Sequence, residues 1–332
     1  MHAWVVDHVT RMDGGPLRRV ERERPEPGPG QVRVAVICCG VCRTDLHLAE
    51  GDLAPRHPQV TPGHEVVGRV DALGPGAVRF ALGERIGVPW LGATDGTCRF
   101  CRGGAENLCL SPRFTGWDHD GGYADACLVD ERFAYRLPAG IGDDQAAPLL
   151  CAGIIGYRAL RLAEVPPGGR LGIYGFGGSA HLTAQVALAQ GLRVHVLTRG
   201  AGNRELAGRL GVDSVGGPAD APPEPLDGAV LFAPAGDLVP VALRALDRGA
   251  TLAVAGIWLS PIPGLDYAAE LFQERRLRSV TANTRRDGEE FLRLAGRLGV
   301  HATTVGYPMD QAQVALADLA DGRFSGAAVL HA

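Results

Sequence analysis

A glycine-rich turn between a strand-like and a helix-like segment constrains this 332-residue chain more than any other feature. Residues 170–174 (RLGIY) form a short apolar run typical of a buried strand, and residues 181–190 are rich in Ala, Leu and Gln, as helices are. Residues 175–180, between them, fit the pattern G-x-G-x-x-G/A. Glycines in that setting allow a tight turn and a close approach of backbone to a pyrophosphate. The turn therefore predicts a dinucleotide site formed by Gly175, Gly177, Gly178, Ser179 and Ala180.

Strand-like and helix-like segments continue to alternate after this turn. We expect strands at 193–197, 228–232, 251–255 and 277–281, and helices at 203–210, 237–246, 287–298 and 310–319. This rhythm predicts an α/β fold with a parallel sheet, because parallel strands need long crossovers that are usually helical.

The choice of coenzyme should be determined at the end of the second strand of this sheet. An acidic residue there would bind the adenosine ribose hydroxyls, but this chain has Thr198 and Arg199. A missing carboxylate beside an arginine favours NADP(H) over NAD(H). The alternative is that Arg199 stacks on adenine and the coenzyme is NAD.

The N-terminal half has a different pattern. Short strands are predicted at 31–37, 66–70 and 84–88, and closely spaced Gly and Pro separate them, which suits a small barrel or sandwich. The pattern changes near Cys151, so we expect a β-rich domain over residues 1–152 and a dinucleotide-binding domain over 153–286.

Two groups of metal-donor residues lie in the first domain. One combines the segments GVCRTDLH (residues 40–47) and GHE (residues 63–65) with the distant Cys151. The other has three thiols within twelve residues, Cys98, Cys101 and Cys109, which predicts a closed structural zinc site on a loop. A lone Cys or His more often fills a core, and we assign Cys38, Cys39 and Cys127 to that role.

The composition excludes several functions. The formal net charge is −4, which disfavours nucleic-acid binding. All 33 basic residues are Arg, so lysine Schiff-base chemistry is impossible. No signal peptide is recognisable and no uninterrupted apolar run approaches the roughly 18 residues of a membrane span, so we expect a cytoplasmic protein without a membrane partner.

Together these segments resemble the zinc-dependent medium-chain alcohol dehydrogenases over nearly the whole chain, and most closely the bacterial propanol-preferring or general alcohol dehydrogenases. The resemblance implies a GroES-like catalytic domain, to which residues 287–332 return, and a Rossmann domain. It also implies reversible hydride transfer between NAD(P) and a small alcohol or aldehyde, and a homo-oligomer, dimer or tetramer.

The resemblance also implies a role for each site residue. Cys42, His64 and Cys151 would hold a catalytic zinc ion, with Asp45 orienting His64 and Glu65 lying behind the metal. Thr44 would bind the alcohol oxygen and pass its proton through the nicotinamide ribose to His47, and Arg43 would contact the coenzyme pyrophosphate. Further candidates, for the wall of the substrate pocket, are Trp90, Leu91 and Trp117.

One position departs from the family pattern. Relatives hold the structural zinc with four cysteines, and the first of these is Asp95 here. A carboxylate can ligate zinc, so the expected set is Asp95, Cys98, Cys101 and Cys109, and an empty site is the alternative.

Two other functions remain open from the sequence. One is a polyol or secondary-alcohol dehydrogenase of the same superfamily. The other is a non-catalytic zinc-ribbon protein that senses a nucleotide, although this does not explain Thr44 and His47.

Overall fold

The computed structural model describes residues 1–332, which divide into two compact units. Unit 1 contains residues 1–151, 282–296 and 302–332, and unit 2 contains residues 152–281 and 297–301. The α/β fold class, with a β-rich unit and a parallel sheet, is confirmed.

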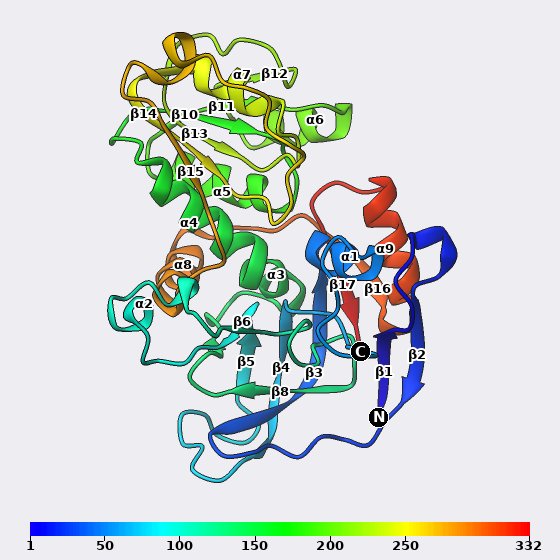
Figure 1. Ribbon diagram of the computed structural model, residues 1–332. Coiled ribbons are helices and arrows are strands. Elements are labelled where there is room, and N and C mark those ends of the chain that lie inside the picture. Colours follow the sequence, from blue (N-terminus) through cyan, green and yellow to red (C-terminus); the bar gives the residue numbers. More distant parts are fainter. The chain divides into compact units, whose positions relative to one another are not determined.

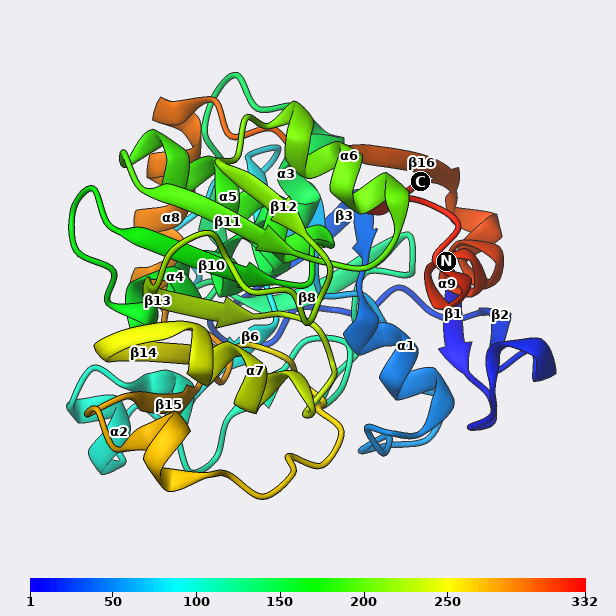
Figure 2. The same ribbon diagram turned by 90° about the horizontal axis from the view of Figure 1, so that it is seen from above.

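Unit 2 is built on a six-stranded parallel sheet, visible in the upper part of Figure 1 and from another side in Figure 2. The strand order is β12-β11-β10-β13-β14-β15. This is the 3-2-1-4-5-6 order of a doubly wound dinucleotide-binding sheet. In chain order the strands are β10 (Arg170–Tyr174), β11 (Arg193–Leu197), β12 (Ser214–Gly216), β13 (Leu226–Leu231), β14 (Leu246–Val254) and β15 (Arg276–Ser279).

Helices cover both faces of this sheet. The step from β10 to β11 and the step from β13 to β14 run in opposite directions across the sheet, so right-handed crossovers place α5 and α7 on opposite faces. Helix α4 packs against α5 and against β13 and β14. The helices of this unit are α4 (Ile154–Ala163), α5 (Gly178–Ala189), α6 (Ala201–Arg209) and α7 (Leu238–Ala245).

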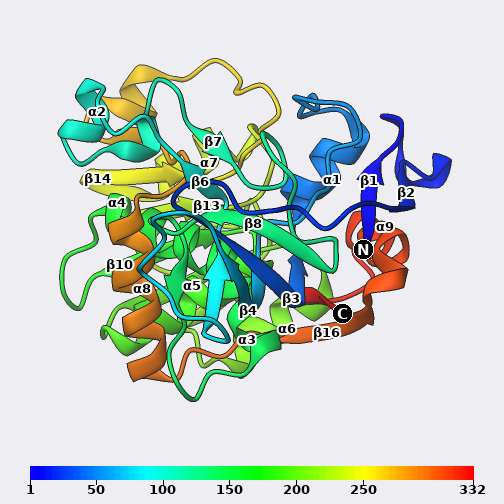
Figure 3. The same cartoon turned by 90° about the horizontal axis from the view of Figure 1, so that it is seen from below.

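Unit 1 is built on a seven-stranded sheet in the order β16-β17-β3-β4-β5-β9, with β8 also paired to β3. Figure 3 shows this unit with β3, β4 and β8 labelled, and both chain ends near α9. The members of the sheet are β3 (Gln31–Val41), β4 (Val66–Leu73), β5 (Arg85–Val88), β8 (Ala126–Asp130), β9 (Tyr135–Arg136), β16 (Thr304–Pro308) and β17 (Ala327–His331).

Smaller elements complete unit 1. Two hairpin-like pairs join β1 (His2–Val6) to β2 (Leu17–Glu21) and β6 (Leu91–Ala93) to β7 (Arg113–Phe114). Its helices are α1 (Arg43–Glu50), α2 (Arg99–Arg102), α3 (Asp143–Pro148), α8 (Arg285–Leu298, whose last two residues belong to unit 2) and α9 (Ala312–Asp321).

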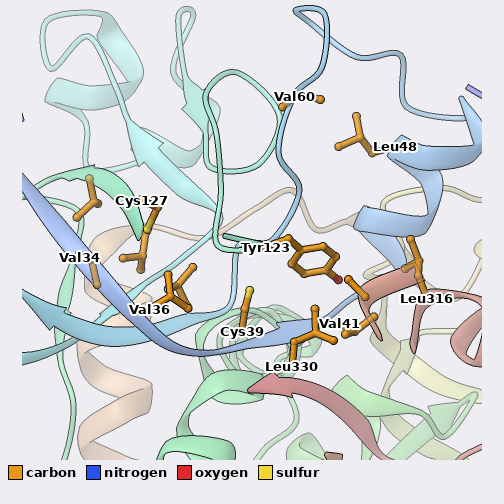
Figure 4. Close-up of a cluster of buried hydrophobic side chains, with 14 of the residues drawn as sticks. Val34, Val36, Cys39, Val41, Leu48, Val60, Tyr123, Cys127, Leu316 and Leu330 are labelled. Carbon is orange, nitrogen blue, oxygen red and sulfur yellow. The ribbon is translucent and has the colours of Figure 1, made fainter. Parts of the chain in front are cut away.

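The core of unit 1 lies between its sheet and the helices α1 and α9. Alternating valines of β3, among them Val32 and Val34, are fully buried, as period-2 patterning predicts. Figure 4 shows Tyr123 inside this core, together with Cys39 and Val41 of β3. A tyrosine hydroxyl at this depth needs a polar partner.

One helical run, residues 143–163, has the length and mean hydropathy (1.3) of a possible membrane span. It joins α3 to α4 through a π-helical turn, Leu149–Gly153. The most apolar 18 residues of this run are 67% buried inside the protein. Buried core helices of other proteins have the same length and hydropathy, so this run is only weak evidence for a membrane-spanning helix.

The predicted elements of unit 2 exist, but several ends differ. The strands at 170–174 and 193–197 match β10 and β11. The helix expected from residue 181 already begins at Gly178, because the motif glycines form its first turn. Strand β14 starts at Leu246, five residues earlier than expected, because α7 ends directly at that residue.

Candidate metal centres and coenzyme site

Four metal-donor side chains from three separated segments converge in unit 1. Cys42 precedes α1, His64 and Glu65 precede β4, and Cys151 lies in the π-helical turn. One donor atom from each residue lies within 4.8 Å of the others. A π turn inside a helix is frequent at functional sites, because it shifts one side chain out of the regular register.

The carboxylate of Asp45 organises this cluster. Its Oδ2 accepts the backbone N–H of Cys42 at 2.9 Å, which caps the N-terminus of α1. Its Oδ1 accepts the backbone N–H of Gly63 at 3.0 Å and lies 3.3 Å from Nδ1 of His64. One buried carboxylate therefore fixes two of the three segments that carry metal-donor side chains.

The cluster fits a zinc ion. His64 is fully buried, yet neither ring nitrogen has a partner with hydrogen-bond geometry. An unsatisfied buried imidazole is costly, and a metal ion would satisfy the nitrogen that faces away from Asp45. Two thiols and one imidazole are the donor set that catalytic zinc takes in some enzymes, and the carboxylate of Glu65 lies within 4.8 Å of them.

The two thiols of the cluster, Cys42 and Cys151, are free and interact with each other. A hydrogen bond from Cys151 to the Cys42 sulfur holds the pKa of Cys42 well below its ordinary value and raises the pKa of Cys151. Burial opposes charge on His64, but the Asp45 carboxylate and the Cys42 sulfur raise the pKa of this imidazole. Anionic and polarisable groups thus surround His64, and surroundings that favour positive charge also favour a bound cation.

The predicted proton-relay residues lie on α1. The Thr44 hydroxyl is 3.7 Å from the Cys42 sulfur, at the edge of the metal cluster. His47 follows one turn later, and its Nδ1 lies 2.8 Å from the carboxylate of Asp52, just beyond the end of α1 at Gly51. Arg43 is the first residue of the same helix.

Aromatic side chains line one side of His64. Trp90 contacts the imidazole edge-on, with ring centroids 4.9 Å apart. Phe114 stacks on Trp90 at 4.8 Å and Trp117 stacks on it at 5.9 Å. Leu91 is buried in the same cluster. The structure thus brings the three predicted wall residues together and adds Phe114.

The second group of donors also converges. Asp95, Cys98, Cys101 and Cys109 each place a donor atom within 4.8 Å of the others, and we call residues 95–109 the cysteine loop. Asp95 Oδ1 accepts the backbone N–H groups of Thr97 and Cys98, at 2.7 and 2.8 Å. Asp95 Oδ2 accepts the Cys109 thiol at 3.1 Å.

The ionisation of the side chains in the cysteine loop favours the binding of a metal ion. The Cys98 N–H and the Cys109 thiol hold the pKa of Asp95 well below its ordinary value, so its carboxylate is ionised at neutral pH. The N–H of Cys101 lowers the pKa of Cys98, whereas burial raises the pKa of Cys109 to about 11. One carboxylate and three sulfurs provide four donors, as structural zinc requires.

The predicted dinucleotide turn lies between β10 and α5 in unit 2. Gly175 has φ +85°, and a Cβ there would lie 2.8 Å from the backbone nitrogen of Ala233, so only glycine fits. A Cβ on Gly177 would meet nothing within 4 Å, which leaves space for a phosphate group beside the backbone. Helix α5 starts at Gly178, Ser179 and Ala180 follow in its first turn, and the N-terminus of this helix favours an anion.

The end of β11 carries arginines and no acidic residue. Thr198 is buried and donates its backbone N–H to Gly216, whereas Arg199 is exposed. Arg204 of α6 donates Nε to the carbonyl of Thr198 at 3.0 Å, which holds a second guanidinium at this strand end. No sequence pattern indicates this role for Arg204.

The structure also identifies three site residues in unit 1 that the sequence analysis did not select. Asp52 contacts His47, Phe114 joins the aromatic stack, and the Tyr123 hydroxyl lies 3.2 Å from Asp45. Asp52 could have been found from its position just after the helix that carries His47. Tyr123 lies 78 residues from Asp45, and no local pattern connects them.

The cysteine loop yields a prediction about zinc. Asp95→Ala removes one of four donors and should weaken zinc binding there by about tenfold or more, a loss of at least about 1.4 kcal/mol. Asp95→Cys should strengthen it. Zinc per chain after dialysis against graded chelator measures both, with exposed Asp13→Ala as the control. Equal zinc retention in all three variants would contradict a ligand role for Asp95.

His119, which lies in the loop that carries Trp117, should make the stability of the protein depend on pH. Burial, with a contribution from Arg113, lowers the pKa of His119 to about 4 in the folded protein. The unfolded chain takes up this proton near pH 6.5, so stability falls as pH drops from about 6.5 toward 4. His119→Gln should recover about 2 kcal/mol of the unfolding free energy lost between roughly pH 7 and pH 5. Urea titrations at both pH values test this, and the same loss in both proteins would refute it.

Comparisons with known proteins agree with this geometry. The family model described as the alcohol dehydrogenase GroES-like domain matches residues 28–139. A probable alcohol dehydrogenase, AdhA, of Mycobacterium tuberculosis (strain CDC 1551 / Oshkosh) is 57% identical over 335 residues, covering 99% of this chain and 97% of the relative. An alcohol dehydrogenase of Geobacillus stearothermophilus is 33% identical and covers 99% of both chains.

A solved structure shows the same fold. A cinnamyl alcohol dehydrogenase from Sorghum bicolor superposes with a TM-score of 0.89 at 30% identity, covering 99% of this chain and 97% of that one. Because the sequence likeness extends over almost the whole of both chains in the Mycobacterium tuberculosis relative, this protein belongs to the zinc-dependent medium-chain alcohol dehydrogenase family.

Proposed function

We propose that the protein reversibly oxidises small primary or secondary alcohols to the corresponding carbonyl compounds, with NADP(H) preferred over NAD(H). The observation that carries this proposal is the convergence of Cys42, His64 and Cys151 beside the hydroxyl of Thr44. Three donors leave the fourth position of a tetrahedral zinc ion for a substrate.

A metal ion and a coenzyme would supply the parts of the chemistry that side chains cannot perform. Zinc bound by these residues provides a Lewis acid that favours the ionised form of an alcohol, and a nicotinamide coenzyme provides the hydride acceptor. The remaining tasks, which are binding, orientation and proton removal, belong to this chain's own residues.

In this proposal, side chains of α1 carry the proton of the alcohol hydroxyl to solvent. Thr44 takes up the hydroxyl proton of the alcohol as it gives up its own hydroxyl proton, and His47, one helical turn further on, accepts the relayed proton and releases it to solvent. The Asp52 carboxylate accepts a hydrogen bond from Nδ1 of His47, which leaves Nε2 as the acceptor in the neutral ring. Asp52 is partly exposed and thus lies at the solvent end of this path.

The other parts of the site orient the ligands. Asp45 fixes the His64 ring, and Glu65 stands beside the donors as an additional carboxylate. The flat faces of Trp90, Phe114 and Trp117 favour apolar or aromatic substrates over polyols. In this proposal the turn from Gly175 to Ala180 binds the coenzyme pyrophosphate.

Assembly and location are part of the same proposal. Strand β15 is an edge strand, and Leu277 on it is 37% exposed. Large exposed apolar side chains precede it in the chain, namely Ile257, Trp258, Ile262, Tyr267 and Phe272. An open strand edge and exposed apolar side chains support a homo-oligomer, a dimer or tetramer. We place the protein in the cytoplasm.

Loss of one metal ligand tests the activity. Cys151→Ser should lower kcat/KM for alcohols from ethanol to benzyl alcohol by about a thousandfold, or about 4 kcal/mol of transition-state stabilisation. The control is Cys127→Ser, because Cys127 is buried in the same unit but lies outside both donor groups. Initial rates with each coenzyme measure the effect, and full turnover by Cys151→Ser would overturn the proposal.

Coenzyme preference depends on Arg199 in this account. Arg199→Asp should shift the ratio of kcat/KM for NADP over NAD toward NAD by about 100-fold, because the carboxylate repels a 2′-phosphate and binds ribose hydroxyls. Arg209→Asp, on exposed α6 surface, makes the same change of charge and is the matched control. A ratio that does not differ between the two variants would favour the reading in which Arg199 stacks on adenine.

A further inference from the structure

The Asp45 carboxylate is 1% exposed and depends on hydrogen-bond donors from several segments. Two of these donors are backbone N–H groups, of Cys42 and Gly63. A buried carboxylate with too few donors would relax away from its position or lose its charge. A third contact of the carboxylate is with His64. The fourth is with a side chain outside the sequence motifs that contain Cys42 and His64.

That side chain is Tyr123. Its hydroxyl donates to Asp45 Oδ2 at 3.2 Å, on the same oxygen that accepts the Cys42 N–H. The tyrosine is fully buried, and Figure 4 shows it in the same core cluster as Cys39 and Val41. Burial and the nearby carboxylate raise the pKa of Tyr123 well above its ordinary value, so the hydroxyl keeps its proton and remains a donor.

The backbone fixes the place of this ring. The Tyr123 N–H donates to the Pro62 carbonyl at 3.0 Å, and the Tyr123 carbonyl accepts the Trp4 N–H at 2.8 Å. A Cβ on Gly63 would lie 2.5 Å from the ring, so the glycine before His64 is needed for this contact. The tyrosine thus packs directly on the segment that presents the histidine.

We propose that Tyr123 is a positioning residue for the metal centre, which acts on His64 through Asp45. This inference rests on the proposed metal site. The hydroxyl fixes Oδ2 of Asp45 and the ring supports Gly63, so that Oδ1 stays beside Nδ1 of His64. Partners of a metal ligand typically affect metal affinity by 10- to 100-fold.

The test measures metal loss at each site separately. Zinc-loaded protein is incubated with a chelator, the thiols that become accessible are alkylated, and peptide mass spectrometry follows each cysteine over time. Cys42 and Cys151 report the catalytic centre, while Cys98, Cys101 and Cys109 report the cysteine loop in the same molecule. A change of overall stability alters both sets, whereas loss of positioning alters only the first.

Tyr123→Phe should accelerate alkylation of Cys42 and Cys151 about tenfold and leave the cysteine loop unchanged. Tyr135→Phe is the matched control, because Tyr135 is a buried tyrosine of the same unit whose hydroxyl contacts Asn283 instead. It should change neither set. Asp45→Asn should accelerate loss from the catalytic centre at least as much as Tyr123→Phe.

Two results would overturn the proposal. One is an unchanged rate at Cys42 and Cys151 in Tyr123→Phe while Asp45→Asn accelerates loss, since Asp45 would then act without the tyrosine. The other is equal acceleration at both sets of cysteines, which would make Tyr123 a general stability residue. If no zinc were bound at Cys42 and Cys151 in the parent protein, the proposed function itself would fail, and this outcome is recognised before any variant is made.

Discussion

The candidate metal centre of unit 1 depends on one buried carboxylate. Asp45 contacts the chain at Cys42, at Gly63 and His64, and at Tyr123, three segments that are far apart in sequence. A carboxylate that is buried away from solvent needs hydrogen-bond donors from the protein. Its position and the positions of these hydrogen-bond donors are therefore determined together. The geometry of the proposed metal ligands follows from this constraint, because Cys42 and His64 are two of the residues it fixes.

The two donor groups differ in how they are held. In the group of Cys42, His64, Glu65 and Cys151, His64 is fully buried and its ring nitrogens lack partners with hydrogen-bond geometry. The cysteine loop is close to the surface, and its aspartate is already satisfied by two backbone N–H groups and a thiol. A metal ion therefore relieves a larger electrostatic cost in the core than on the loop, although both sets have suitable donors.

Local patterns were sufficient to predict the regular parts of unit 2. The apolar runs of β10 and β11 and the glycine turn after β10 are encoded within a few residues, so their positions follow from the sequence. Helix starts were less accurate, because glycines at the first turn of α5 resemble loop residues. Strand β14 was extended by pairing with β13, which no local pattern shows.

The candidate site required information of another kind. Spacing alone does not bring Cys151 to Cys42, and the resemblance to a known family supplied that prediction. The structure adds the reason, which is a π-helical turn at residues 149–153 that no propensity identifies. Tyr123 was missed because its contact with Asp45 exists only after the loop before β8 folds back on Gly63.

The account's central claim is that one ion joins Cys42, His64 and Cys151. Crystals grown with zinc, measured on both sides of the zinc absorption edge, test it most directly. We predict an anomalous peak about 2.3 Å from both sulfurs and about 2.0–2.1 Å from the His64 nitrogen that faces away from Asp45. An oxidised Cys42–Cys151 pair, or sulfurs and imidazole without such a peak while the cysteine loop binds zinc, would contradict the account.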